Sequence, residues 1–272
     1  MASIDSYLDD LLRQGRAYLS RNDVSAALGL KPQALAAALT RAISKHRLAN
    51  PRHGFYLILR PEDQIAGAPD PVKWIDPLMK HQRIDYRISL LRAAAFHGSS
   101  HQASMIFQVV VPRQLGDFDL GRHRLQFLYQ GAEAFAQLNK PELVDQIKSD
   151  AGFAKVAGVE LTLLDCVRYF HKAAGINRVA QIAKDIGAKA NPRVLAKAAA
   201  AYENSAVRRL GYLLECAGHG RQADALEPFV RHAKTTLSLD PAVRPIVAAL
   251  AQHYEKNAKW KLMINETVDV AE

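Results

Sequence analysis

Three helix patterns follow one another within residues 1–45, and their order limits the folds open to the chain. Apolar residues recur at helical spacing over 4–12. Ser20 is a typical N-cap residue and predicts a second helix over 21–28. Pro32 suits the first turn of a helix, because the N–H that proline lacks would be unpaired there. It predicts a third helix over 32–45.

A short strand and a basic hairpin complete this pattern. Residues 17–19 predict a strand, and two further strand patterns, 48–49 and 55–59, flank a turn at 50–54. Helix, helix, turn, helix and hairpin is the order of elements in a winged helix-turn-helix, whose third helix enters the major groove of DNA. The sequence therefore predicts a winged helix-turn-helix DNA-binding domain over residues 1–66.

The two faces of the predicted third helix differ in character. At about 100° per residue, one face, expected to lie against the core, contains Leu35, Leu39, Ala42, Ile43 and His46. The opposite face contains Gln33, Ala37, Thr40, Arg41 and Ser44. Small residues allow a helix to approach base edges, and glutamine and arginine can read adenine and guanine. The residues predicted to bind DNA are Arg21, Lys31, Gln33, Thr40, Arg41, Ser44, Lys45, Arg47, Arg52 and His53.

The charge distribution agrees with a polyanionic partner. The chain has a formal net charge of +9, and residues 11–60 hold nine Lys or Arg against one acid. Residues 155–261 hold seventeen against nine, whereas 61–154 are nearly neutral. Basic surfaces attract nucleic acid because each phosphate contact releases counterions. A winged helix used for protein contacts, with its basic residues merely solvated, remains an alternative.

A chain of 272 residues is long enough for two domains, and Pro and Gly residues at 61–71 predict a linker between them. The second domain is expected to span 71–272, with a small sheet over 71–159 and helices over 160–272. Helix patterns lie at 86–96, 160–170, 177–186, 192–203, 205–217, 222–232 and 241–253. Strand patterns lie at 104–111, 122–129, 144–148 and 153–159, and 260–264 predicts a strand that returns to this sheet. The fold class expected is α+β.

Two histidines spaced four apart, His97 and His101, raise the question of a metal site. Gly98 and two serines separate them, no glutamate follows His97, and a helical zinc site normally needs a third ligand. The sequence instead predicts that the 86–96 helix ends at His97, whose ring bonds the freed carbonyls. The following loop is expected to be pinned by serine and histidine side chains.

Motifs of catalysis and of cofactor binding are missing from the sequence. There is no P-loop, GxGxxG, GxSxG or CxxC motif and no telling pair of carboxylates, so we predict no enzyme, no cofactor and no metal. No apolar run is long enough to span a membrane, and the N-terminus is acidic where a secretory signal is basic. With only two cysteines, Cys166 and Cys216, both in apolar helical contexts, we expect a reduced, cytoplasmic protein.

Four segments resemble one family. Residues 85–102, DYRISLLRAAAFHGSSHQ, look like the "YY-x-x-LLsAA-x-xHG-x-xHQ" stretch of AbiEi antitoxins. Residues 54–58 resemble the wing of that family, 74–79 its domain junction, and 156–165 its "VA-x-x-EKTLLD" run. The resemblance covers roughly residues 1–170. Arg87 stands where the family has a second tyrosine, and Leu161 where it has lysine.

The resemblance implies a cytoplasmic antitoxin of a type IV toxin–antitoxin, or abortive-infection, system, which acts in phage defence. Such a protein binds double-stranded operator DNA, represses transcription of its own operon and counteracts a nucleotidyltransferase-like toxin. It names no residue for the antitoxin activity. Two alternatives stay open: a winged-helix regulator that senses a small ligand, and a metal-dependent or phosphoryl-handling enzyme that uses His97 and His101.

Overall fold

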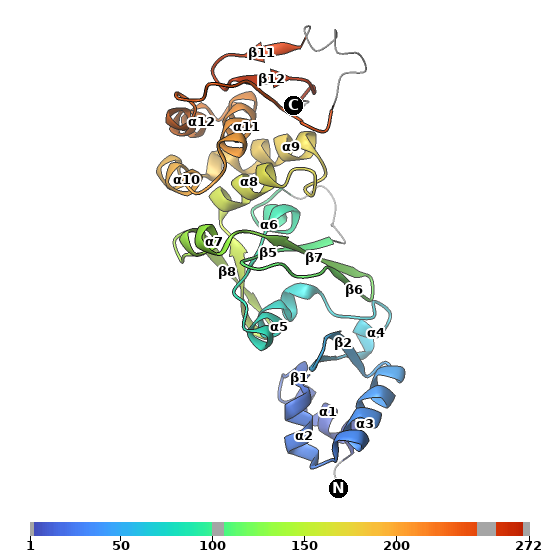
Figure 1. The fold of residues 1–272 in the computed structure, drawn as a ribbon. Helices are drawn as coiled ribbons and strands as arrows, with labels where there is room; N and C mark the ends of the chain where they lie inside the picture. Colours follow the sequence, from blue (N-terminus) through green and yellow to red (C-terminus); the bar gives the residue numbers. More distant parts are fainter. Residues whose placement is uncertain (1–2, 100–105, 244–253, 269–272) are drawn as a thin grey trace. The chain divides into compact units, whose positions relative to one another are not determined.

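The computed structural model describes residues 3–99, 106–243 and 254–268, and it is a mixed α+β protein with small sheets and C-terminal helices, as predicted (Figure 1). The chain divides into two compact units. The first comprises Met1–Arg87, Met105–Gln130 and Gln146–Lys155, and the second comprises Ile88–Ser104, Gly131–Asp145 and Val156–Glu272. Whether residues 1–66 fold alone stays a prediction.

The N-terminal module contains three helices and a three-stranded antiparallel sheet of order β1-β3-β2. The elements are α1 (Ile4–Arg13), β1 (Tyr18–Ser20), α2 (Arg21–Leu28), α3 (Pro32–Ser44), β2 (Leu48–Arg52) and β3 (Phe55–Ile58). This arrangement is compatible with a winged helix-turn-helix, in which the β2–β3 hairpin would be the wing.

Local chemistry explains where the helices of this module begin and end. The Ser20 side chain accepts a hydrogen bond from the Asp23 backbone, and the Asp23 carboxylate accepts one from the Ser20 backbone, which forms a complete capping box for α2. Gly29 ends α2 in the left-handed conformation with φ +59°, and Pro32 opens α3. The core beneath includes Leu8, Leu19, Val24, Leu35 and Leu39.

The faces of α3 agree with the prediction except near its C-terminal end. Leu35, Leu39 and Ala42 are buried as expected, and Ala38 joins them. Two residues that were assigned to the core, Ile43 and His46, are exposed instead. The helix ends at Ser44, and His46 lies in a turn with φ +54°, so the helical periodicity does not extend to it.

A six-stranded sheet of order β6-β7-β5-β4-β9-β8 follows, with β5 parallel to β7 over a register from Ile106↔Arg124 to Val111↔Tyr129. Its strands are β4 (Arg87–Ile88), β5 (Ile106–Val111), β6 (Phe118–Leu120), β7 (His123–Tyr129), β8 (Val144–Ser149) and β9 (Gly152–Ala157). The helices of this region are α4 (Pro61–Gln64), η1 (Pro71–Lys73), α5 (Ile75–Gln82) and α7 (Ala132–Leu138). The helix predicted over 86–96 is shorter, because β4 occupies its first turn and pairs with β9.

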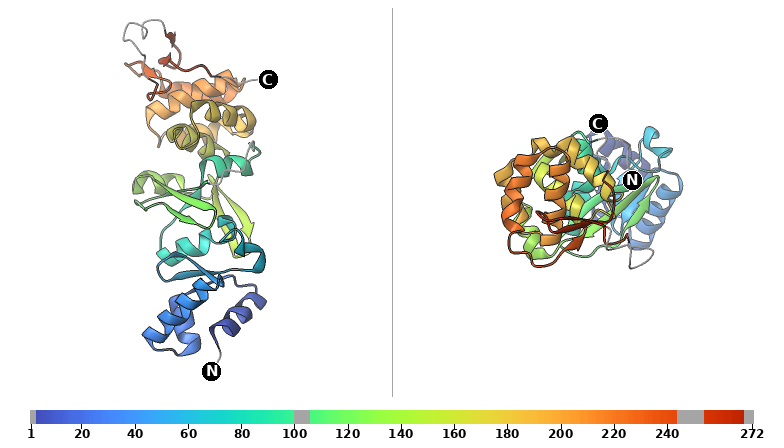
Figure 2. Two further views of the ribbon diagram at one scale, coloured as in Figure 1. Left: turned by 90° about the vertical axis from the view of Figure 1, so that its right-hand side faces the viewer. Right: turned by 90° about the horizontal axis from the view of Figure 1, so that it is seen from above.

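A helix forms in each of the ranges predicted between 160 and 232, although those predicted over 192–203 and 222–232 end early, at Ala199 and Leu226. The helices are α8 (Val159–Arg168), α9 (Ile176–Ile186), α10 (Pro192–Ala199), α11 (Asn204–Cys216) and α12 (Gly220–Leu226), with the short η2 (Gly187–Lys189) and η3 (Glu227–Phe229) after α9 and α12. Together with α6 (Leu90–Phe96) they pack side by side (Figure 2). Most of the helix predicted over 241–253 lies outside the described residues.

The strand predicted at 260–264 forms, but it does not return to the six-stranded sheet. It is β12 (Leu262–Ile264), which pairs with β10 (Leu237–Ser238) and β11 (Glu255–Asn257) in a separate three-stranded sheet. No helix among the described residues is both long enough and apolar enough to span a bilayer.

Two neighbouring arginines of α11 hold this C-terminal sheet. Arg208 is buried and donates to the backbone carbonyls of Trp260, Lys261 and Thr235. Arg209 donates to the carbonyls of Leu239, just after β10, at 2.8 Å and of Ser238, the last residue of β10, at 3.0 Å. Such a cationic pair is more often solvated, but here both guanidinium groups donate to backbone carbonyls in and beside the C-terminal sheet.

Candidate nucleic-acid interface

The residues predicted to meet base edges lie on the exposed face of α3. Pro32 and a helix-forming alanine-rich segment position this face. Small side chains occupy much of it, because Ala34, Ala36 and Ala37 are also exposed. The predicted contact residues of α3 and its ends that are exposed are Lys31, Gln33, Thr40, Arg41, Ser44 and Lys45.

An open groove of about 300 Å³ runs between the start of α1 and α3. Ile4, Leu28 and Leu30 contribute apolar walls, and Arg41 and Lys45 border it. Arg41 forms no ion pair with any residue that the structure describes, and its backbone carbonyl accepts a hydrogen bond from the Ser44 hydroxyl at 2.9 Å. The Arg41 guanidinium is therefore available to a ligand, and its direct readout partner in DNA would be guanine.

Acids on α1 neutralise part of the predicted positive surface. Arg47 pairs with Asp9 at 2.5 Å and with Asp5 at 3.8 Å, and Lys45 pairs with Asp5 at 3.6 Å. The sequence analysis did not predict these pairs. The spacing of Asp5 and Asp9, four residues apart on the polar side of the first helix, could have indicated them. Exposed pairs of this kind contribute little stability, so a phosphate can compete for either cation.

The remaining predicted contacts lie at the start of α2 and on the β2–β3 hairpin. The backbone N–H of Arg21 donates to the Gly54 carbonyl at 2.9 Å, which fixes the start of α2 beside the hairpin turn. His53 is exposed in that turn. Arg52 differs from both, because it is half-buried and its guanidinium lies over the ring of Phe118. The structure thus places the Arg21 backbone beside the turn that contains His53, whereas the Arg52 guanidinium packs on Phe118.

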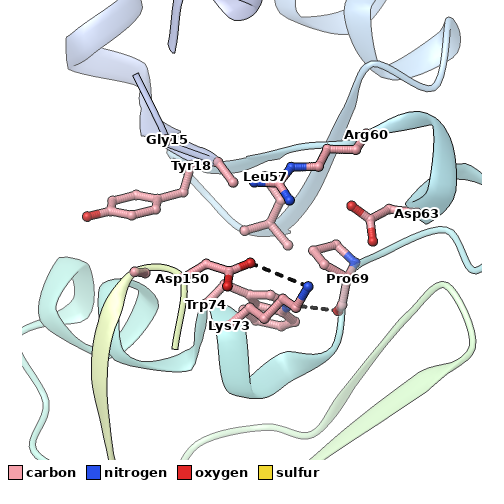
Figure 3. Close-up of a pocket in the computed structure, with 11 residues that line it drawn as sticks. Gly15, Tyr18, Leu57, Arg60, Asp63, Pro69, Lys73, Trp74 and Asp150 are labelled. Atoms are coloured by element: carbon pink, nitrogen blue, oxygen red, sulfur yellow. Dashed lines mark hydrogen bonds and ion pairs between the residues drawn. The ribbon is translucent and has the colours of Figure 1, made fainter. Parts of the chain in front are cut away.

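A cleft in the same compact unit is lined by Leu57, Trp74 and the Lys73–Asp150 ion pair, whose N···O distance is 3.4 Å (Figure 3). The indole N–H of Trp74 already donates to the Pro69 carbonyl at 2.9 Å. The cleft leaves about 30 Å³ for the centres of water molecules, enough for about two waters. A space of this size does not favour the binding of a small-molecule effector in the cleft.

His97 has a structural role at the end of α6. It is the C-cap of α6, one residue after the last helical residue, and Gly98 follows with φ +104°. The expectation that its ring bonds freed helix carbonyls is wrong: Nε2 lies 2.7 Å from the carbonyl oxygen of Ala157 at the end of β9. The predicted pinning of the loop is observed at Ser99, which donates to Asp185 at 2.6 Å. His101 lies outside the described residues.

A buried carboxylate joins the two most specific sequence motifs, 85–102 and 156–165. Asp165 is fully buried and accepts hydrogen bonds from Ser89 Oγ and Tyr202 OH, each at 2.7 Å. Together with the bond between His97 and Ala157, these contacts tie the first motif to the second. The buried residues of both motifs that the structure describes therefore contribute to the interior of their domain. Among the described residues, no three His, Cys, Asp or Glu side chains are placed to hold a metal ion.

A comparison with protein-family models agrees with the family resemblance of these two motifs. Residues 87–216 match the model of the AbiEi antitoxin C-terminal domain. This segment is thus an AbiEi-family antitoxin domain, as the sequence resemblance predicted, and the match supports an antitoxin role in a toxin–antitoxin system, which implies a toxin partner. No curated protein matches the chain.

The fold is also similar to that of a mycobacterial protein. The crystal structure of the RV2827C protein from Mycobacterium tuberculosis covers 94% of this chain, and the alignment spans 89% of that protein. The TM-score is 0.64 and the sequence identity is 17%. At this identity the likeness describes the fold alone.

Proposed function

We propose that this antitoxin binds double-stranded operator DNA through α3 and its flanking cations, represses its own operon and counteracts a nucleotidyltransferase-like toxin. The observation that carries the DNA-binding part is the exposed, small-residue face of α3 with an arginine that has no ion-pair partner among the described residues. The matched antitoxin domain supports the toxin-directed part. We propose that the protein acts in the cytoplasm, where both DNA and a translated toxin are found, and without catalysis of its own.

The contacts divide into two classes with different expected effects. Gln33, Thr40 and Arg41 lie on the face that would meet base edges, where each good pairing discriminates by about 1–3 kcal/mol. Lys31, Lys45 and Ser44 at the ends of the helix, with Arg21 and His53 nearby, would meet phosphates and fix the register. Arg47 would join them by exchanging its pairs with α1 for a phosphate.

The test is a titration of labelled DNA from upstream of the protein's own gene with Arg41→Ala. We expect a loss of about 1–3 kcal/mol, or roughly 5- to 150-fold in Kd, with a smaller loss on unrelated DNA. Arg13→Ala is the matched control, because it removes the same charge from an exposed arginine of α1 that pairs with Asp10. Equal effects of both variants would contradict base readout by Arg41.

A further inference from the structure

Arg52, at the end of β2, is held by the β6–β7 hairpin. Its Nη2 donates to the backbone carbonyl of Gly116. Its guanidinium carbon lies 4.4 Å from the ring centre of Phe118 and 5.7 Å from that of Phe127. All three partners lie on or beside one hairpin, 64 or more residues away in the sequence.

The chemistry of this hairpin fits a guanidinium group. The two phenylalanine rings stack with centres 6.0 Å apart, which offers π faces to the cation. Asp117 lies between Gly116 and Phe118 and accepts a hydrogen bond from the Phe127 backbone at 2.8 Å. Burial lowers the pKa of Arg52, and the negative charge of Asp117 opposes that shift. The guanidinium has therefore given up part of its hydration for protein contacts.

The same hairpin also holds the segment that follows the N-terminal module. The Arg122 backbone donates to the Ala66 carbonyl at 2.9 Å. Gly67 and Gly121 approach so closely that a Cβ on Gly67 would lie 2.7 Å from the Gly121 Cα. The module is thus attached to β6–β7 at two places, the tip of β2 and the Ala66–Gly67 backbone.

We propose that Arg52 is a positioning residue for DNA binding: it fastens the β2–β3 hairpin to β6–β7 and does not itself bind phosphate. The working DNA-binding unit then includes the β6–β7 hairpin as well as residues 1–66. This inference rests on the proposed DNA-binding function and assigns Arg52 a different role from the exposed cations around it.

Two properties separate a positioning arginine from a phosphate contact. Loss of a phosphate contact reduces the slope of log Kd against log salt by about one. Loss of a positioning residue weakens binding and leaves that slope unchanged. Lysine serves well as a point charge for phosphate, but it lacks the planar fork that stacks on rings and bonds a carbonyl at the same time.

The experiment measures DNA affinity at four salt concentrations for the full-length protein and for Arg52→Ala, Arg52→Lys, Phe118→Leu and the double variant Arg52→Ala/Phe118→Leu. We expect each of the four variants to lose about 2- to 30-fold in affinity, with an unchanged salt slope. The double variant should be no weaker than Arg52→Ala, because both changes break one contact. Lys31→Ala serves as the comparison, since its exposed cation should reduce the slope by about one.

The proposal is overturned if Arg52→Ala reduces the salt slope by about one, Arg52→Lys restores affinity and Phe118→Leu has no effect. Hydrogen exchange of the full-length protein gives a readout that needs no DNA. Amide exchange over residues 50–55 should accelerate in both Arg52→Ala and Phe118→Leu and stay unchanged in Lys31→Ala. Acceleration without any DNA binding by the wild-type protein would refute the DNA function while the fastening contact stands, and unchanged exchange would refute the contact itself.

Discussion

Gly211, in the middle of α11, lies against the ring of Trp260, and its replacement by alanine tests this packing. A glycine there normally weakens a helix, and replacement by alanine at a compatible site stabilises a protein by about 0.4–1 kcal/mol. At Gly211 the space is taken by the indole of Trp260. An added Cβ would lie 2.6 Å from Cε3 of that ring and closer still to Cζ3 and Cη2.

The Trp260 ring cannot move away at low cost. It is fully buried, its indole N–H donates to Glu215, and its backbone carbonyl accepts from Arg208 at 3.0 Å. Overpacking a core costs about 1–3 kcal/mol, and loss of a buried tryptophan ring about 3–5 kcal/mol. The packing cost of Gly211→Ala should lie between these two costs, and the better helix propensity of alanine offsets part of it. We therefore expect a net loss of about 1–3 kcal/mol, or a Tm lower by about 2–12 °C.

Thermal and urea unfolding of the full-length protein measure this loss. Gly220→Ala is the control, because that glycine lies at the start of α12 with nothing within 4 Å of an added Cβ, and we expect it to be neutral or stabilising. In a Trp260→Leu background the alanine methyl has room, so Gly211→Ala should change sign there. A Gly211→Ala protein that melts at or above the wild-type Tm would refute the packing of Trp260 on α11.

Two further predictions concern polar groups. Tyr202→Phe removes an O–H donor from the buried carboxylate of Asp165 and should destabilise the protein by about 1–3 kcal/mol in urea unfolding. An unchanged midpoint would contradict that hydrogen bond. Burial raises the pKa of Asp23, but its hydrogen bonds with Ser20 and the charge of Arg16 lower it by more. The pKa of Asp23 is therefore below its ordinary value. Asp23→Asn should therefore destabilise the protein at pH 7, and this difference should shrink as the pH falls from the ordinary carboxyl pKa through the lowered pKa of the folded state, where the wild-type carboxyl takes up its proton. A difference in urea unfolding that does not shrink as the pH falls would contradict this origin.

Much of the N-terminal module could be predicted because its signals are local. Ser20, Gly29 and Pro32 each mark a helix end through the chemistry of the adjacent backbone, and this chemistry is readable without tertiary structure. Periodicity placed Leu35 in the core, but the predicted core face extended to His46, two residues past the end of α3, because nothing in the sequence marks that end at Ser44.

The contacts that the sequence did not predict share a different cause, because they join distant segments of the chain. Arg52 reads as a wing cation, and only the fold brings it to Phe118 and Gly116. Arg208 is buried because the fold brings the backbone carbonyls of Trp260 and Lys261 to its helix. The pairing of Arg47 with Asp9 likewise joins the residue before β2 to α1 across 38 residues. Side-chain partners at such separations cannot be read from composition or spacing.

The antitoxin role is tested most directly by growth of cells that express the gene next to this one, for which we propose a nucleotidyltransferase-like toxin, with and without this protein. We expect that the toxin gene alone arrests growth and that the full-length protein restores it. We also expect the Arg41→Ala protein to restore growth although it binds the promoter more weakly, because protection is assigned to the domain matched over residues 87–216. Failure of the folded wild-type protein to protect would contradict the assigned toxin. Protection by the wild type but not by a folded Arg41→Ala protein would contradict the division into DNA binding and antitoxin activity.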